Sequence, residues 1–145
     1  MRYRVTIGDD QHICYIRCIC ETASGELLIG DRKNNNVQLL NQTYKMVAYC
    51  YLPIRPSAMC SIDSSLVAVS NECTNELHFI RVNNGNSLIK DRIMKLQHKC
   101  WGITHHQGNL YITDGIALYH YTVDGRLLST IYQDTSDKWT GKNYN

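Results

Sequence analysis

The chain has 145 residues, a length that usually forms one domain, and 43% of its residues are hydrophobic and 19% charged. A formal net charge of +2 is too small to indicate nucleic-acid binding by itself, and no run of 18 apolar residues predicts a membrane-spanning helix. Residues 1–20 carry Asp9, Asp10 and His12 and have no apolar core of the kind found in a secretory signal. Composition and charge therefore favour a globular protein of the cytoplasm with no membrane partner.

Cysteines are numerous and odd in number. The seven are Cys14, Cys18, Cys20, Cys50, Cys60, Cys73 and Cys100. Because no secretory signal is recognised, free thiols in a reducing compartment are expected. Several fall in apolar runs, where a free cysteine behaves as a small buried hydrophobic residue.

A short block of the form small residue, x, apolar, x, apolar, x, Asp or Asn occurs three times. The copies are residues 25–31, 65–71 and 108–114, and Leu27, Val67 and Leu110, the third residue of each copy, are 40 and 43 positions apart. Strand-like units that recur at about 40–45 residues are typical of β-propeller blades. The repeat therefore predicts a propeller, a scaffold whose binding specificity usually lies in its loops.

The predicted elements follow one another as three units of four short strands. A leading segment, 1–12, contains a predicted strand at 3–7. The first blade, 13–53, has predicted strands at 16–20, 26–30, 37–40 and 45–52. The second blade, 54–96, has them at 58–62, 66–70, 77–81 and 88–93, and the third, 97–132, at 101–104, 110–113, 118–122 and 127–132. A polar tail at 133–145, which contains Trp139, ends the sequence.

Turn chemistry agrees with this division. Residues 34–36, 83–86 and 124–125 are runs of Asn, Asp and Gly, which tolerate the positive φ angles of tight hairpins. No window shows a sustained helical period, so almost no helix is expected. Strand lengths alone would also allow a β-sandwich. The registered repeat of strand, Asp or Asn, and turn favours an all-β, β-propeller-like fold of about three four-stranded antiparallel blades.

Three blades are too few for a closed ring, because closed propellers have about four to eight. The chain is therefore expected to be a fragment, an open half-ring, or one half of a homodimer that completes six blades. The free sides of the two terminal blades should be apolar, since each lacks a neighbour to cover it. Marginal stability or dimerisation follows from that expectation.

Two stretches resemble a particular family. Residues 25–31, 35–41 and 44–47 form the first, and residues 100–104, 108–112 and 123–128 form the second. Together they resemble the C-terminal NHL-like propeller of tripartite-motif proteins, especially the type expanded in invertebrates, over residues 13–132. The motifs are moderately specific for the NHL-like superfamily and weakly specific for any one member.

The resemblance implies a propeller that binds a client, either protein or RNA, in a protein whose RING, B-boxes and coiled coil lie N-terminal to it. The RING carries the ubiquitin-ligase activity of such proteins. This sequence contains no Cys-x-x-Cys pair and about half the expected blades. Ligase activity therefore does not belong to these residues, and the resemblance predicts a non-enzymatic, client-recognising segment.

Two groups of residues in the sequence have side chains of the types that bind metal ions. Cys14, Cys18 and Cys20, with His12 nearby, lack the paired Cys-x-x-Cys spacing of structural zinc sites, so buried strand cysteines are favoured. His98, Cys100, His105 and His106 form the second group. The pair at 105–106 is expected in the turn between the first and second strands of blade three, apart from His98, so solvated turn histidines are favoured over a metal site.

Polar residues Asp31, Asn71 and Asp114 recur after the second strand of each blade. A ring of carboxylates at that level would resemble the metal site of gluconolactonase-like hydrolases, the third function considered. One position is Asn, however, and no Glu or His recurs with it, so capping of loop backbone by the short side chain is favoured. No nucleophile motif occurs, and no cofactor is predicted.

Basic residues gather in loops that propeller topology places on one face. The candidate partner-binding residues are Arg32, Lys33, Arg55, Glu72, His98 and Lys99. An acidic protein segment fits such a patch best, RNA phosphate is the alternative, and a solvated charged surface is the plain reading. Trp101 beside Gly102 is interpreted as a packing anchor at a blade entrance.

Overall fold

The computed structural model describes residues 13–71 and 73–134. The strand predicted at 3–7, Glu72 and most of the polar tail lie outside these residues. Within them the chain forms twelve strands and no helix, so none that is long and apolar enough to cross a membrane. The strands are β1 Ile16–Glu21, β2 Leu27–Asp31, β3 Asn36–Leu40, β4 Met46–Tyr51, β5 Ala58–Ser61, β6 Leu66–Ser70, β7 Glu76–Asn83, β8 Ser87–Lys95, β9 Gly102–His106, β10 Asn109–Thr113, β11 Ala117–Thr122 and β12 Leu127–Gln133.

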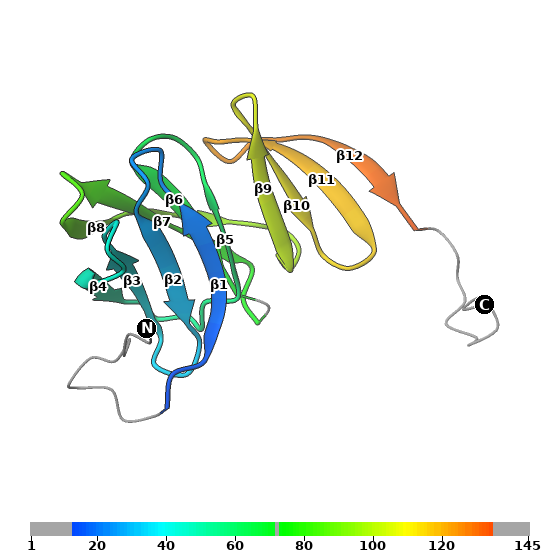
Figure 1. The fold of residues 1–145 in the computed structure, drawn as a ribbon. Helices are drawn as coiled ribbons and strands as arrows, with labels where there is room; N and C mark the ends of the chain where they lie inside the picture. Colours follow the sequence, from blue (N-terminus) through cyan, green and yellow to red (C-terminus); the bar gives the residue numbers. More distant parts are fainter. Residues whose placement is uncertain (1–12, 72, 135–145) are drawn as a thin grey trace, which may run out of the picture.

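These strands build three antiparallel sheets in which neighbours in sequence are neighbours in space. The orders are β1-β2-β3-β4, β5-β6-β7-β8 and β9-β10-β11-β12. The first strands lie side by side, since β1 contacts β5 and β5 contacts β9 (Figure 1). First strands innermost and fourth strands outermost are the arrangement of propeller blades. The predicted all-β, open propeller of three four-stranded blades is confirmed.

Two apolar cores hold neighbouring blades together. One core joins the first and second sheets and includes Leu28, Leu39 and Val69. The other joins the second and third sheets and includes Phe79 and Ile112. Side chains alternate between the two faces of a strand, so β6 supplies Val67 and Val69 to the first core and Leu66 and Ala68 to the second. This explains why all five residues of β6 are buried.

A hydrogen bond repeats in each blade just after its fourth strand. The backbone N–H of Leu52 donates to the carbonyl of Asn35 at 2.7 Å, and that of Leu96 donates to Asn75 at 2.7 Å. In the third blade the N–H of Asp134 donates to the carbonyl of Ile116 at 2.8 Å. Each bond ties the chain leaving a blade to the loop between the second and third strands of the same blade.

The two free sides of the array differ in chemistry. On the free side of the first sheet the middle row of cross-strand partners is Ile19, Ile29, Gln38 and Tyr49, which is apolar except for the buried Gln38. Ile19 is 59% and Tyr49 41% exposed. The free side of the third sheet is polar across its middle row. Equivalent rows can be compared on the face of each sheet that is directed away from the preceding blade. The cross-strand partners in this row are Cys20, Leu28, Leu39 and Ala48 in the first sheet, Cys60, Ala68, Phe79 and Arg92 in the second, and Thr104, Tyr111, His120 and Ser129 in the third.

The prediction of an apolar free side is therefore wrong for the third sheet. The rings of Tyr111 and His120 stack there with centroids 4.9 Å apart and an interplanar angle of 8°. Aromatic side chains on directly opposed residues of adjacent strands are close enough to pack in this way. The middle row on the free side of the third blade therefore consists of polar side chains.

The turn prediction for the histidine pair is also wrong. His105 and His106 are the last two residues of β9, paired with Leu110 and Asn109. The turn itself is Gln107 followed by Gly108, with φ angles of 49° and 80°. Gly108 adopts that angle without a steric penalty, which lets β9 continue through both histidines.

Candidate functional site

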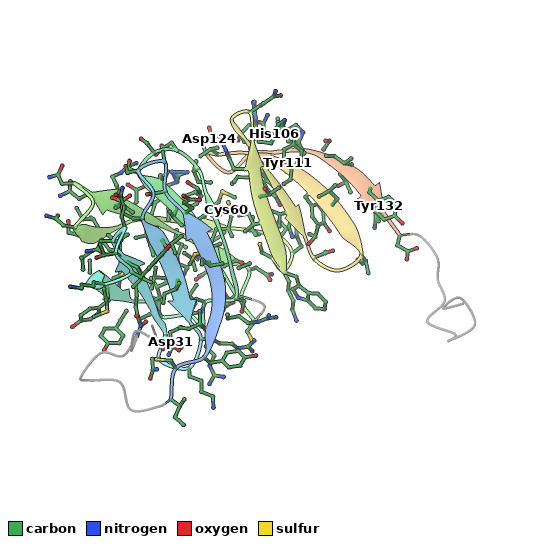
Figure 2. The ribbon with its side chains drawn as sticks, in the orientation of Figure 1. Asp31, Cys60, His106, Tyr111, Asp124 and Tyr132 are labelled. Carbon is green, nitrogen blue, oxygen red and sulfur yellow. The ribbon has the colours of Figure 1, made fainter. Side chains whose placement is uncertain are left out.

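One face of the array is formed by the loops that carry the predicted partner-binding residues. Strands alternate in direction within each blade, so the start of β1 and the β2–β3, β4–β5, β6–β7, β8–β9 and β10–β11 connections all lie at the same ends of the sheets. We call this the inter-blade loop face. Figure 2 shows Asp31 at this end of the first sheet and His106 and Asp124 at the opposite end of the third.

Three of the predicted cations converge on this face. Arg32 and Lys33 in the β2–β3 loop and Arg55 in the β4–β5 connection line a pocket of about 380 Å³ together with Tyr15. Lys33 and Arg55 are exposed, and Tyr15 is 48% exposed. The two loops are far apart in sequence and meet because β4 returns the chain to the end of the sheet where β2 ended. The pocket brings together positive charge and one phenol.

The Asp31 carboxylate fixes the backbone of this pocket. Its Oδ1 atom accepts hydrogen bonds from the N–H groups of Tyr15 at 3.0 Å, Lys33 at 3.1 Å and Asn34 at 3.3 Å. Its Oδ2 atom accepts one from the Asn34 side chain at 2.8 Å. Burial alone would raise the pKa of Asp31, but these hydrogen bonds outweigh burial and hold the pKa below its usual value. Asp31 is therefore a structural anion that positions cationic neighbours.

Asn71 and Asp114 do the same work in the other blades. Asn71 Oδ1 accepts from the N–H groups of Cys73 at 3.1 Å and Thr74 at 2.7 Å. Asp114 Oδ1 accepts from those of Ile116 at 3.1 Å and Ala117 at 2.9 Å. The interpretation of this repeat as loop capping is confirmed. No cluster of His, Cys, Asp and Glu suited to a metal ion occurs among residues 13–71 and 73–134.

The backbone around Arg55 is held by its neighbours. Ile54 and Pro56 are both buried, and Ile54 belongs to the core between the first and second sheets. Alternation of buried and exposed residues in this connection turns the Arg55 side chain outward. The pocket is therefore lined by side chains whose main chains are fixed on both sides of it.

The other predicted partner-binding residues do not line this pocket. His98 and Lys99 lie in the β8–β9 connection on the same face, and Glu72 is outside the described residues. His98 is half-buried: its ring stacks on Tyr119 with centroids 3.7 Å apart, and its Nε2 lies 2.7 Å from the Tyr121 hydroxyl. His98 is thus a packed residue at the junction of the second and third blades, which corrects its reading as a solvated turn histidine.

Trp101 gives the face an aromatic group that the sequence analysis did not assign to binding. The indole packs over Gly115, where an added Cβ would lie 3.1 Å from the ring, yet Trp101 is 57% exposed. Ile116 beside it is 53% exposed. The packing interpretation holds for one edge of the ring only. The position of Trp101 in a loop on the binding face was the feature of the sequence that could have indicated an exposed aromatic group.

Five of the seven cysteines pack in or against the two apolar cores. Cys18 and Cys20 pack against the core between the first and second sheets, which agrees with the strand interpretation and not with zinc. Burial raises the thiol pKa to about 11 for Cys18, Cys50 and Cys100 and to about 12 for Cys20 and Cys60. Cys73 is exposed. A raised pKa keeps the thiol protonated and unreactive at neutral pH.

Solved structures similar to this chain are β-propellers. Kuenenia stuttgartiensis hydrazine synthase matches with a TM-score of 0.72 and 15% identity, covering 92% of this chain and 40% of that one. The β-propeller domain of Cps50 (Swd1) from Myceliophteria thermophila matches at 0.66 and 14%, covering 82% and 43%. BBS1N, solved in complex with ARL6DN, matches at 0.64 and 16%, covering 91% and 42%.

No protein-family model matches the sequence, and no curated protein sequence matches it. The chain spans 40 to 43% of the length of the three similar structures. At 14 to 16% identity the likeness shows the fold alone. The neighbours include an enzyme and a protein bound to another protein. What the comparisons establish for this chain is a β-propeller architecture.

Proposed function

We propose that this chain is a non-catalytic protein-recognition segment of a β-propeller protein, and that its client binds at the inter-blade loop face. The observation that carries the proposal is the convergence of Arg32, Lys33 and Arg55 on one pocket. An acidic segment of a client would meet three cations there, and Trp101 and Ile116 offer apolar contact on the same face. Tryptophan and arginine are the residue types that most often dominate protein interfaces.

Support for a protein client also comes from the kind of fold. BBS1N has the same fold and was solved in complex with ARL6DN, a protein. The resemblance of residues 13–132 to NHL-like propellers extends the proposal: the chain would act as the client-binding end of a tripartite-motif ubiquitin ligase in the cytoplasm. Ligase activity would reside in a RING domain elsewhere in such a protein.

The proposal is tested by differential capture from native extract. The chain is immobilised as wild type, as Arg32→Gln/Arg55→Gln, and as Lys45→Gln/Arg126→Gln. The last pair is a matched control, because it removes the same charge from the β3–β4 and β11–β12 turns at the opposite face. A client retained by wild type and control but lost from Arg32→Gln/Arg55→Gln is the expected result. Retention of every partner by all three proteins would overturn the proposal.

RNA is the second candidate, favoured by Tyr15 beside the three cations, since an aromatic ring and basic groups together suit an unstacked base and its phosphate. Phosphate contacts release counterions, so RNA affinity would fall steeply with salt. Binding of a short single-stranded RNA is measured at salt concentrations between about 50 and 300 mM, over which phosphate contacts weaken steeply. The salt dependence distinguishes an RNA ligand from a protein client. A flat response or no binding removes RNA.

A further inference from the structure

The pocket lined by Tyr15, Arg32, Lys33 and Arg55 is not an open cationic site. Arg32 is half-buried and already has an interaction partner. A guanidinium that is partly withdrawn from water is stabilised by an anion beside it. An acidic group of the chain itself is therefore a candidate occupant of the pocket.

The described acids at this end of the first two sheets have other partners. Asp31 is fully buried and accepts hydrogen bonds from its own loop and from the N–H of Tyr15. Glu76, the first residue of β7, lies with its Oε2 atom 3.1 Å from Nε2 of the buried His78. The acids that precede β1 or follow β6 and lie outside the described residues are Asp9, Asp10 and Glu72.

The pair Asp9 and Asp10 is joined to the pocket by a short stretch of chain. Asp10 precedes Tyr15, which lines the pocket, by five residues. An extended chain spans about 3.3–3.6 Å per residue, so these residues are enough for the two carboxylates to turn back onto the pocket. Two adjacent carboxylates also balance three cations better than the single carboxylate of Glu72 does. The tether raises their effective concentration at the pocket to about the millimolar range.

The free side of the first sheet gives a second observation that points to the same segment. In its middle row Ile29 and Gln38 are buried, whereas Ile19 and Tyr49 on the two edge strands are exposed. The second sheet packs on the opposite side, and Gln38 Oε1 has no hydrogen-bond partner among the described residues. Residues 3–7, in which Tyr, Val and Ile alternate with Arg and Thr, suit such a surface. A leading segment that runs from this side to the pocket accounts for both observations.

We propose that residues 1–12 fold back on the first blade and that Asp9 and Asp10 occupy the cationic pocket, where they compete with an acidic segment of the client. The inference rests on the proposed function and adds the regulation of its site. A client has to displace the acidic pair, so weakly acidic segments are rejected. Contacts elsewhere on the face, such as those offered by Trp101 and Ile116, favour the client over the tethered pair.

Cross-linking of the full chain tests the occupant without any client. A water-soluble carbodiimide joins a carboxylate to an amine in direct contact and adds no spacer, and mass spectrometry of the digested protein identifies the joined residues. We expect Lys33 to be joined to Asp9 or Asp10, and Lys33→Arg should abolish this product. A product that joins Lys33 to Glu72 alone, or the absence of any Lys33 product, would overturn the inference.

Binding of a fluorescent hexaglutamate peptide tests the competition. Asp9→Asn/Asp10→Asn should bind the peptide at least about tenfold more tightly than wild type, because the tethered competitor is removed. Glu21→Gln/Asp124→Asn is the matched control, since it removes the same charge from exposed positions at the opposite face. Equal affinity of wild type and Asp9→Asn/Asp10→Asn would contradict the competition, and an equal gain in the control would assign the effect to net charge. Amide NMR spectra of each variant establish that the fold is intact.

The inference and the proposed function fail in different ways. If wild type binds the peptide through Arg32 and Arg55 as tightly as Asp9→Asn/Asp10→Asn does, the proposed function stands and the competition is wrong. If the Lys33 product forms but Asp9→Asn/Asp10→Asn binds neither the peptide nor a client from extract, the occupant stands and recognition of an acidic client is wrong. A Lys33 product together with tighter peptide binding, lost again when Arg32→Gln/Arg55→Gln is added, supports both.

Discussion

The backbone amide of Tyr15 donates to the Asp31 carboxylate at 3.0 Å, and through this bond the start of the first blade is fixed to the end of its second strand. The carbonyl of Tyr15 accepts in turn from the N–H of Arg32 at 2.8 Å. Two residues that line the candidate pocket are thereby positioned by a buried acid. Asp31 links the stability of the blade to the geometry of the site.

Replacement of Asp31 should separate its hydrogen bonds from its charge. Asp31→Ala leaves the amides of Tyr15 and Lys33 without their acceptor, and a lost buried hydrogen bond of this kind costs about 1–3 kcal/mol of unfolding free energy. Asp31→Asn keeps an Oδ1 acceptor, as Asn71 does in the second blade, so it should cost less. Urea unfolding of both variants measures the difference. Equal losses for Ala and Asn would contradict the role given to Oδ1.

Capping carboxylates should make the protein sensitive to acid. Hydrogen bonds from Ser65 and Leu66 lower the pKa of Asp63, and those of Ile116 and Tyr119 outweigh burial to lower that of Asp114, as in Asp31. A lowered native pKa means that the unfolded chain binds protons more readily, near pH 3.9. The stabilisation is therefore complete above about pH 5 and is lost as the pH falls through the native pKa values.

The urea midpoint measured between about pH 2 and pH 7 tests this sign. Wild type should lose stability as the pH falls below about 4, and Asp31→Asn should show a smaller loss. Asn71→Ala serves as a control, because it removes a cap that carries no charge and should lower stability equally at all pH values. A wild-type midpoint that rises on acidification would contradict the assignment.

Local chemistry made most of the fold predictable. The strand at 66–70 is predicted with its bounds unchanged, since every residue of it packs against a neighbouring blade. The capping role of Asp31 was predictable because its partners Lys33 and Asn34 follow it by only two and three residues. Sequence also placed Arg32 and Arg55 on one face through topology alone. That Tyr15, just before β1, lines the same pocket was not expected from the sequence.

Interactions between distant segments could not be read in advance. The stack of His98 on Tyr119 joins a connection to a strand of the next blade, and no local pattern encodes it. The expected turn between β9 and β10 is present, but it lies at Gln107 and Gly108 and not at His105 and His106, since the strand continues through both histidines. Polar residues on the free side of the third blade were missed because the repeat was read at its apolar positions, which face the second blade.

Thiol labelling should divide the cysteines by burial. The five with pKa values raised to about 11 or 12 are Cys18, Cys20, Cys50, Cys60 and Cys100, and all should resist Ellman's reagent until the protein unfolds. Cys73 is exposed and should react first, in a fast phase that Cys73→Ser removes. Fast labelling of Cys20 or Cys60 in the folded protein would show that the cores between blades open readily.

The polar row on the third sheet bears on self-association. A homodimer that completes six blades would bury Tyr111 and His120 of one copy against Ile19 and Tyr49 of the other, and a buried polar group without a partner is unfavourable. The row therefore opposes ring closure by a second copy. It also keeps a contiguous apolar surface from forming at that end of the array.

Restoring the apolar pattern of the other blades should reverse this effect. Tyr111→Leu/His120→Leu places at these positions the residue type that Leu28 and Leu39 provide in the first sheet. Light scattering as a function of concentration should show this variant dimerising or aggregating at concentrations where wild type does not. Thr43→Leu/Lys45→Leu is the control, because it adds the same two leucines to the exposed β3–β4 turn, where they form no sheet surface. A leucine variant as monodisperse as wild type, or a wild type that dimerises more strongly than the variant, would contradict the protective role of the row.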